Sequence, residues 1–291
     1  MKIAIHAGVF GTDDDQLTKC LLRNRDVLLE KGVSVPGPSR YRRELRHILD
    51  KMSYESRLDG QRETLLNGLD GPLDCPRLLL TNPNYFSVPR RALARNRFYP
   101  NADMRLAATR DLFQEDQVEV FLGLCNPAIF VPKLEADAPG AGIYEVFRDC
   151  DPEALHWSEM LYRMRAAAPN IPITVWCHED TPLIWPEVLH RICGLETPIP
   201  LEGEYAILRQ VMHPNGLEKL RDYMARNSTL TDQQRREVTA AFLERHALDD
   251  YLETEIHLPG WTQETVDTLT RIYEEDLERI ALIEGVRFIR P

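Results

Sequence analysis

The chain has 291 residues, 43% hydrophobic and 28% charged, so it can bury a sizeable core, and it contains no low-complexity tract typical of disorder. A formal net charge of −11, from 46 acidic and 35 basic residues, argues against a general nucleic-acid-binding role, which usually leaves a basic footprint. The six cysteines are scattered, and we expect them to be reduced thiols. The sequence shows no signal peptide and no apolar run of the roughly 20 residues that a membrane span needs. We therefore expect a cytoplasmic protein with no membrane partner.

The N-terminal stretch reads as a strand, a loop and a helix. The strand is predicted over Lys2–His6 and the helix from about Gln16 to Lys31, with Gly8 and Gly11 in the loop between them. Such a loop lets backbone N–H groups converge on an anion at the helix N-terminus. Asp13–Asp15 stand where that anion would lie, and the function of the protein depends largely on how this conflict is resolved.

Strand and helix patterns then alternate to about residue 193. Helices are predicted over Arg40–Met52, near Leu58–Leu69, and over Met104–Gln114, Pro152–Ala168 and Thr181–Cys193; strands over Arg77–Thr81, Val118–Leu124 and Pro172–Cys177; and a hinge over Ala138–Gly142. Apolar strands between helices indicate a mostly parallel sheet covered on both faces, an α/β fold with about four or five strands. From about residue 200 only helices are expected, one from Thr231 to about His246 and a last one that Gly285 closes, within a single domain spanning 1–291.

Several segments together resemble a bacterial family of sulfotransferases that use 3′-phosphoadenosine phosphosulfate (PAPS) as donor. The similar segments are His6-x-Gly8 with Leu17, Asn24, Leu28 and Gly32-Val33; Phe121–Ala128; Trp176–Trp185; and Tyr273–Leu277 with Gly285-Val286 and Pro291. The resemblance implies a P-loop-like three-layer α/β fold. It also implies sulfuryl transfer to a hydroxyl of a carbohydrate or small metabolite, with no metal required.

The donor-site positions of that family are occupied differently in this chain. Gly11 stands at the position of the family's lysine, Thr12 at the next threonine, Asp13–Asp15 replace Gly-Thr-Thr, and Gln16 replaces the serine. Cys125 stands where the family has the arginine for the 3′-phosphate, and Lys133 stands near its matching serine. The resemblance makes the following residues the candidate cofactor-binding set: Gly8, Gly11, Thr12, Gln16, Asn126 and Lys133.

These replacements weaken the expected donor site. Two unit charges about 5 Å apart repel by roughly 3 kcal/mol at an effective dielectric near 20, and several loop carboxylates would repel a polyanion more strongly. A helix dipole offsets only about 0.3–1 kcal/mol of this. We therefore predict that the loop does not bind PAPS in the manner of the family, unless another cation, with Lys133 and Arg148 as candidates, fills the vacated place.

Each remaining polar group has a functional interpretation and a structural one. His178 or Glu179, after a predicted strand, is the candidate catalytic base; alternatively, Asp180 or Thr181 caps the next helix and His178 and Glu179 line the surface. Asp13–Asp15 either cap their helix or contact a metal or another ligand. The larger set of candidates comprises His6 as a structural or catalytic residue, Cys125 as a buried or nucleophilic thiol, Trp176 and Trp185 as core residues, and Arg40, Arg42, Arg43, Arg90, Arg91, Arg95 and Arg97 as solvated charge or an anion-gathering group.

Two functions from different classes follow from these observations. In the first, the protein is a sulfotransferase-like enzyme that acts on a hydroxylated small molecule or glycan. In the second, it keeps the sulfotransferase fold but is a non-catalytic binding or scaffold protein that recognises a glycan or a partner protein. A cation within reach of the Gly8–Gly11 backbone would favour the first function.

Overall fold

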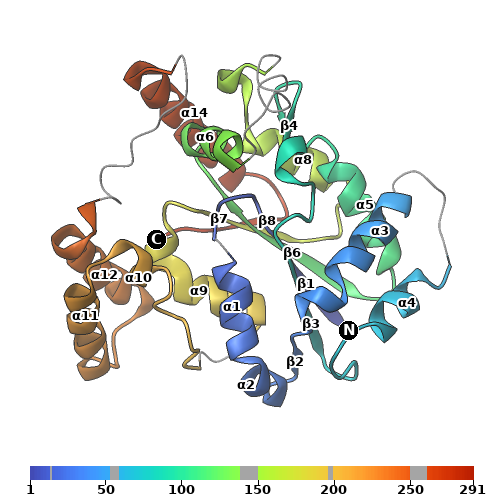
Figure 1. The fold of residues 1–291 in the computed structure, drawn as a ribbon, viewed down its shortest axis with the longest axis horizontal. Helices are drawn as coiled ribbons and strands as arrows, with labels where there is room; N and C mark the ends of the chain where they lie inside the picture. The colour runs from blue at the N-terminus through green and yellow to red at the C-terminus, as the bar shows by residue number, and fades with distance from the viewer. Residues whose placement is uncertain (14, 53–58, 138–149, 196–198, 250–260) are drawn as a thin grey trace.

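A six-stranded, all-parallel sheet forms the centre of the molecule (Figure 1), in a computed structural model that describes residues 1–13, 15–52, 59–137, 150–195, 199–249 and 261–291. The strand order is β2-β3-β1-β6-β7-β8. The strands are β1 (Lys2–Ala7), β2 (Val33–Ser34), β3 (Arg77–Asn82), β6 (Gln117–Leu124), β7 (Ile173–Cys177) and β8 (Val286–Ile289). The predicted α/β class with a mostly parallel sheet is confirmed.

Helices cover both faces of the sheet, as the continuous apolar runs of its central strands require. One face is covered by α1 (Gln16–Arg23), α2 (Arg25–Glu30) and α9 (Thr181–Cys193). The other is covered by α3 (Arg42–Met52), α4 (Gln61–Asn67), α5 (Ala102–Leu112), α6 (Pro127–Asp137), α8 (Trp157–Ala167) and α14 (Gln263–Ala281). The result is a three-layer arrangement with a separate apolar cluster on each side of the sheet.

A helical group follows α9 and packs around its own small core. It consists of α10 (Leu208–Val211), α11 (Pro214–Arg226) and α12 (Asp232–His246), which lie beyond α9 in Figure 1. The predicted capping box at the start of α12 is confirmed, because Thr231 and Gln234 exchange their side-chain and backbone hydrogen bonds. None of the helices in the described parts of the chain is long and apolar enough to cross a membrane.

Two predictions about the ends of the chain were wrong. The segment after residue 200 contains a strand, because β8 pairs with β7 at the edge of the sheet; four residues that are partly exposed give too short a pattern to indicate it. The helix expected over Gln16–Lys31 is divided at Asn24, whose side-chain amide exchanges two hydrogen bonds with the backbone of Glu202, both 2.8 Å long. A tertiary contact therefore breaks a continuous helical pattern.

Three other predicted segments differ in detail. The loop expected over Asn82–Pro100 contains the short helix η2 (Pro89–Arg91) and a hairpin of β4 (Leu93–Ala94) with β5 (Arg97–Phe98). The helix predicted from Pro152 is a 3-10 turn, η3 (Pro152–Ala154), followed by α8, and α3 is preceded by η1 (Pro38–Arg40). The hinge predicted over Ala138–Gly142 lies outside the described residues.

The sheet has a topological switch point at β1. The chain passes from β1 to β2 and β3 on one side, and it then continues to β6 and β7 on the other. In open parallel sheets, ligands bind outside the carboxyl ends of the strands at such a point. The loop after β1 and the first turn of α6 after β6 both lie there, so this edge is the place to look for a site.

Candidate functional site

The start of the loop after β1 is held against the carboxyl end of β3. The Gly8 N–H donates to the Asn82 carbonyl over 3.2 Å, and a Cβ on Gly8 would lie 2.7 Å from Cα of Pro83. Glycine is therefore needed at position 8 for this close approach. On the opposite side of the loop, the Phe10 N–H donates to the buried hydroxyl of Tyr99 over 3.0 Å.

Lys133 reaches the loop from α6. Its Nζ donates to the Gly11 carbonyl over 2.9 Å, and a Cβ on Gly11 would lie 3.0 Å from the Lys133 Cδ. Gly11, at a φ of +72°, therefore both adopts a left-handed conformation and leaves room for the lysine. Of the two candidate cations named from the sequence, Lys133 lies within reach of the Gly8–Gly11 backbone, and Arg148 lies outside the described residues.

The described acidic residues of the loop already have partners within the protein. Asp13 accepts the Leu17 N–H of the first turn of α1 through Oδ2, over 3.0 Å. Asp15, at the N-cap position with a φ of 60°, makes no cap bond, but its Oδ1 lies 3.4 Å from Nη2 of Arg42. The capping interpretation is confirmed for Asp13, whose carboxylate takes an N–H that an anion at this helix end would use.

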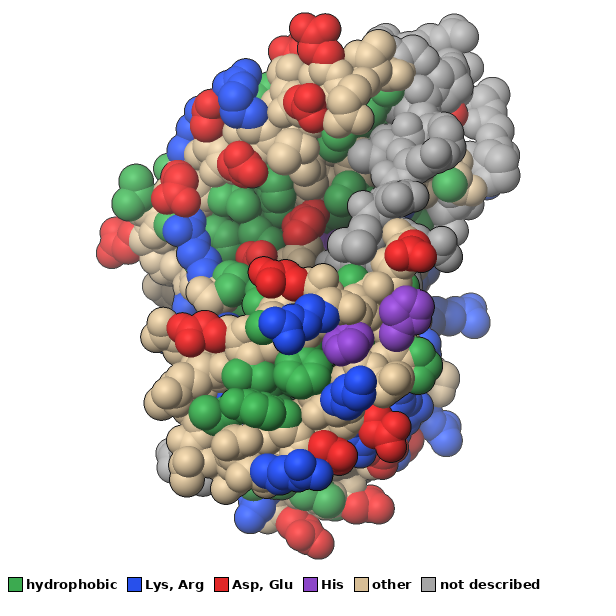
Figure 2. Space-filling view, turned by 90° about the vertical axis from the view of Figure 1, so that its left-hand side faces the viewer, with side chains coloured by type: hydrophobic (Ala, Val, Ile, Leu, Met, Phe, Trp, Pro, Cys, Tyr) green, Lys and Arg blue, Asp and Glu red, His purple; other side chains and the backbone are tan. Residues whose placement is uncertain are grey.

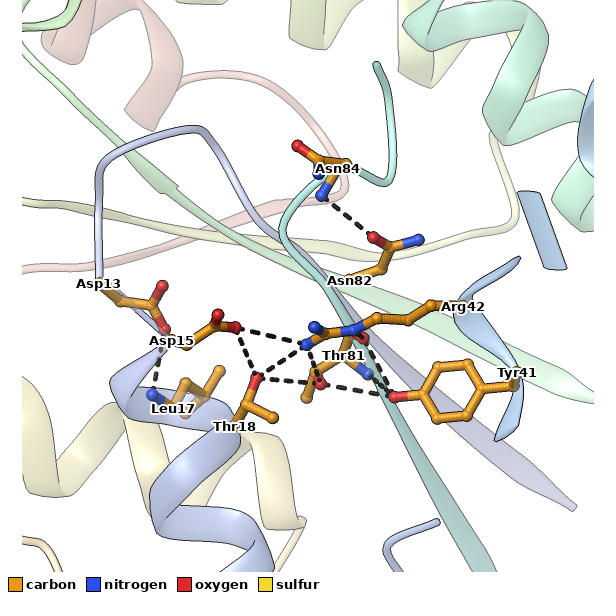
Figure 3. Close-up of polar contacts among 9 residues, drawn as sticks. All are labelled: Asp13, Asp15, Leu17, Thr18, Tyr41, Arg42, Thr81, Asn82 and Asn84. Atoms are coloured by element: carbon orange, nitrogen blue, oxygen red, sulfur yellow. Dashed lines mark hydrogen bonds and ion pairs between the residues drawn. The ribbon is translucent and has the colours of Figure 1, made fainter. Parts of the chain in front are cut away.

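Arg42 connects the loop, α1 and β3. Its Nε donates to the Thr81 carbonyl over 2.7 Å, and its Nη2 donates to the hydroxyls of Thr81 and Thr18 over 3.0 and 3.1 Å. Tyr41 completes the arrangement, because its hydroxyl accepts the Thr81 N–H over 2.7 Å. Figure 3 shows the guanidinium between Asp15 and Thr18 on one side and Thr81 and Tyr41 on the other.

The sequence did not single out Arg42 from the neighbouring arginines. Helical periodicity does distinguish Arg42 from Arg43, because Arg42 lies three and seven positions before the buried Leu45 and Leu49, whereas Arg43 falls on the exposed face of α3. Arg40, in η1, is also exposed. The arginines at 90, 91, 95 and 97 are also exposed, and Arg97 pairs with Glu159. These exposed arginines fit the interpretation as solvated charge, whereas Arg42 belongs to the site.

His6 lies under the loop at the end of β1. Its side chain is on the face of the sheet that α1 and α9 cover, where its ring stacks on Trp176 with centroids 6.1 Å apart. His6 is 2% exposed, and neither ring nitrogen has a hydrogen-bond partner in the described parts of the chain. Burial lowers the pKa of His6, against the opposing effect of Asp13, so the ring is held neutral.

Glu179 joins three elements rather than projecting freely. Its Oε1 accepts the Asn126 N–H over 2.7 Å, and its Oε2 accepts the Tyr273 hydroxyl of α14 over 3.2 Å. Burial raises the pKa of Glu179 and raises the pKa of Tyr273 well above its ordinary value. The sequence did not indicate that Tyr273 contacts Glu179, because the two residues are 94 positions apart in the chain.

The other predicted site residues lie around the same strand ends. The half-buried His178 donates its backbone N–H to the Leu124 carbonyl over 2.7 Å. Asn126 directly precedes α6, with its Oδ1 accepting the Ala128 N–H and its Nδ2 donating to the Thr270 hydroxyl. Thr12 is buried and donates its hydroxyl to the Val9 carbonyl, and Gln16 is the first residue of α1. The set is therefore brought to one edge of the sheet, divided between the loop after β1 and the ends of β6 and β7.

Cys125 and two tryptophans near the candidate site lie in the core. Burial raises the pKa of Cys125 well above its ordinary value, in agreement with a buried, unreactive thiol. Trp176 and Trp185 are buried in the core, as predicted. Within the described ranges no group of three or more His, Cys, Asp or Glu side chains is arranged to hold a metal ion.

One face of the molecule is hollowed, and a separate cavity lies at the amino ends of two strands. Figure 2 shows a face hollowed between an upper part, where α14 lies, and a lower part, where α11 and α12 lie, with apolar and acidic side chains in the hollow. At the amino ends of β1 and β6, a cavity of about 550 Å³ is lined by residues that include Lys2, Asp116 and Gln117. Burial opposes the ionisation of Asp116, but its ion pairs with Arg62 and the N-terminal ammonium outweigh that effect and lower its pKa.

Comparison of this chain with known proteins found no similar protein. No family model, no curated protein and no solved structure matches this chain. The molecule is thus defined by its fold and its site: an all-parallel α/β protein with a cation-flanked loop at the topological switch point. Its function has to be argued from that site.

Proposed function

We propose that this chain is a sulfotransferase-like protein whose Gly8–Asp15 loop faces the sulfuryl donor, with PAPS as donor and a hydroxyl of a carbohydrate or small metabolite as acceptor. The observation that carries the proposal is the 2.9 Å contact between Nζ of Lys133 and the Gly11 carbonyl. A cation at that point compensates for the lysine that the loop lacks. Arg42 supplies a second fixed positive charge on the other side of the loop.

The proposed reaction breaks the bond between sulfur and the donor's phosphate oxygen and forms a bond between sulfur and the acceptor oxygen. Negative charge develops on the departing phosphate, and the Lys133 ammonium would stabilise it there. The acceptor hydroxyl must lose a proton, for which His178 and Glu179 are the candidate bases. The raised pKa of Glu179 makes it a stronger base than an exposed carboxylate, although it must first give up the Tyr273 hydrogen bond.

A second candidate function rests on a different observation. Because the Asp13 carboxylate already accepts the Leu17 N–H, a donor phosphate would have to displace it to use the N-terminus of α1. A chain that keeps this contact permanently would be a non-catalytic binding or scaffold protein with the sulfotransferase fold. The two candidates differ in whether the loop binds the nucleotide.

Calorimetric titration with 3′-phosphoadenosine 5′-phosphate, the desulfated donor, tests the proposal. We expect the wild-type chain to bind it and Lys133→Met to bind it at least about tenfold more weakly, a difference of about 1.4 kcal/mol. Lys219→Met is the control, because it removes the same charge from the exposed surface of α11. Absence of binding to the wild-type chain, or equal binding by Lys133→Met, would contradict the proposal and favour the non-catalytic function.

A further inference from the structure

We propose that the cavity of about 550 Å³ at the amino ends of β1 and β6 binds a small N-acylated amino acid, with Lys2 and the backbone of Val118 holding its carboxylate and its amide. The candidate site described above lies at the carboxyl ends of the same strands, so this inference is independent of the proposed function. The volume of the cavity falls within the range of about 300–1,000 Å³ that is usual for small-molecule sites.

The charges that line the cavity favour an anionic ligand. Both carboxylates of its wall already have a cation: Asp116 accepts two hydrogen bonds from the Arg62 guanidinium, over 2.7 and 2.9 Å, and Glu119 is paired with Arg77. Lys2 is exposed and has no ion-pair partner among the residues that the structure describes. A carboxylate that enters the cavity would therefore find an ammonium that is free to pair with it.

The backbone of β6 leaves a donor and an acceptor open to the same cavity. Val120 pairs with Ile173 of β7, and its N–H donates to the Pro172 carbonyl over 3.0 Å. Because successive residues of a strand alternate in direction, the N–H and C=O of Val118 point to the same side, toward Asn170 and Pro172. β7 has not begun there, and proline has no N–H to donate to the Val118 carbonyl. In the described parts of the chain, neither backbone group of Val118 has a hydrogen-bond partner on that side.

An extended N-acylated amino acid fits these two groups. In an antiparallel pair two opposed residues exchange both backbone hydrogen bonds, so the ligand's amide N–H would donate to the Val118 carbonyl and its carboxylate would accept the Val118 N–H. Lys2 lies close to this carboxylate position, because its ladder partner in β6 is Gln117, the residue before Val118.

The remaining wall favours an apolar side chain on the ligand. Phe113, Ile171 and Pro172 supply apolar surface to the cavity. The second cation of the wall, Arg110, is engaged by the Asp111 carboxylate over 2.8 Å, so we assign the ligand's charge to Lys2.

A titration followed by the backbone amide resonances in NMR spectra tests the inference, with N-acetyl-L-phenylalanine as the probe. We expect this probe to bind with a Kd below about 1 mM and to shift the amide resonance of Val118. Two matched probes separate the contacts, since N-acetyl-L-phenylalaninamide lacks the charge and 3-phenylpropionate lacks the amide. Each of these two should bind at least about fivefold more weakly than N-acetyl-L-phenylalanine.

Three variants locate the binding. Lys2→Met should weaken the binding of N-acetyl-L-phenylalanine at least about fivefold and leave that of the neutral amide unchanged. Lys219→Met, which removes the same charge from the exposed surface of α11, should bind the probe as the wild-type chain does. Gln114→Trp places a large side chain at an exposed position of the wall and should weaken the binding of all three probes. Thermal unfolding of each variant verifies that it is folded before titration.

The inference is overturned if the wild-type chain does not bind N-acetyl-L-phenylalanine, if Lys2→Met binds it as Lys219→Met does, or if the neutral amide binds as tightly as the acid. Equal binding of 3-phenylpropionate would also overturn it, because the Val118 backbone would then contribute nothing. The nucleotide titration with Lys133→Met reports on the carboxyl ends of the strands, so either proposal can fail while the other stands.

Discussion

Lys133 and Gly11 are 122 positions apart in the chain, yet the lysine ammonium donates to the glycine carbonyl over 2.9 Å. The contact joins α6, which follows β6, to the loop that follows β1, and so it bridges the topological switch point of the sheet. It depends on glycine, because a Cβ at position 11 would lie 3.0 Å from the lysine side chain.

Gly11→Ala should destabilise the protein more than Gly60→Ala. Both glycines have a positive φ, of 72° and 78°, so each alanine costs about 1–2 kcal/mol in backbone strain. A Cβ on Gly11 would contact Lys133, whereas a Cβ on Gly60 would have no neighbour within 4 Å among the residues that the structure describes. Urea unfolding of the two variants measures the difference in unfolding free energy. Equal losses of unfolding free energy would contradict the prediction, because they would show that the Lys133 side chain moves away from the new Cβ without destabilising the protein.

Arg42→Met should lower the free energy of unfolding by about 1.5–3 kcal/mol, because the buried Thr81 carbonyl and hydroxyl lose a charged donor. Arg43→Met, one position along α3 and exposed, should change it by less than about 0.5 kcal/mol. Chemical denaturation of both variants under the same conditions measures the contrast. Similar values for the two would show that the Arg42 contacts contribute nothing beyond surface charge.

Glu179→Ala should cost about 2 kcal/mol of stability, since the Asn126 N–H and the Tyr273 hydroxyl both lose their acceptor. Glu179→Gln should cost less than about 1 kcal/mol, because the amide keeps one acceptor oxygen and its nitrogen can donate to Tyr273. Thermal and urea unfolding measure both. If a transfer activity is found, its loss in the stable Glu179→Gln variant would assign the carboxylate a role in proton transfer.

Stability should fall as the pH drops below about 6.5, in part because of His6. Burial lowers the pKa of His6 in the folded state, so the unfolded chain takes up a proton at a higher pH than the folded chain does. The stability associated with neutral His6 is therefore complete above the unfolded pKa and is lost as the pH falls through it. His6→Phe should flatten the profile of unfolding free energy between pH 7 and 5, whereas His47→Phe, at an exposed position, should keep its slope.

Among the six cysteines, Cys75 should react first with a thiol reagent such as DTNB. It is half-buried, whereas Cys20, Cys125, Cys150, Cys177 and Cys193 are buried. Burial raises the pKa of Cys177 to about 12 and that of Cys193 to about 12, which leaves almost no thiolate at neutral pH. A second thiol that reacts at the rate of Cys75 in the native protein would contradict this ordering, and Cys75→Ser identifies the fast phase.

The sequence by itself determined the class of fold and the edge at which the site lies. Apolar runs such as Leu78–Leu80 and Val118–Leu124 can be buried on both faces only in a sheet covered by helices, and this follows from their composition. The glycines and aspartates between β1 and α1 likewise indicated the loop, because glycines between a strand and a helix let backbone N–H groups converge at the helix N-terminus. Local patterns failed where the signal was short or opposed by a distant contact, as at β8 and Asn24.

Only the tertiary structure decided which polar and charged groups meet. Lys133 lies at Gly11, Arg42 at Asp15, and Tyr273 at Glu179, and each pair joins elements that are far apart in the chain. The isolation of both His6 nitrogens is also a property of packing, since it depends on what lies around the ring. Side-chain pairing across strand ends depends on strand order and helix placement, which periodicity along one chain does not encode.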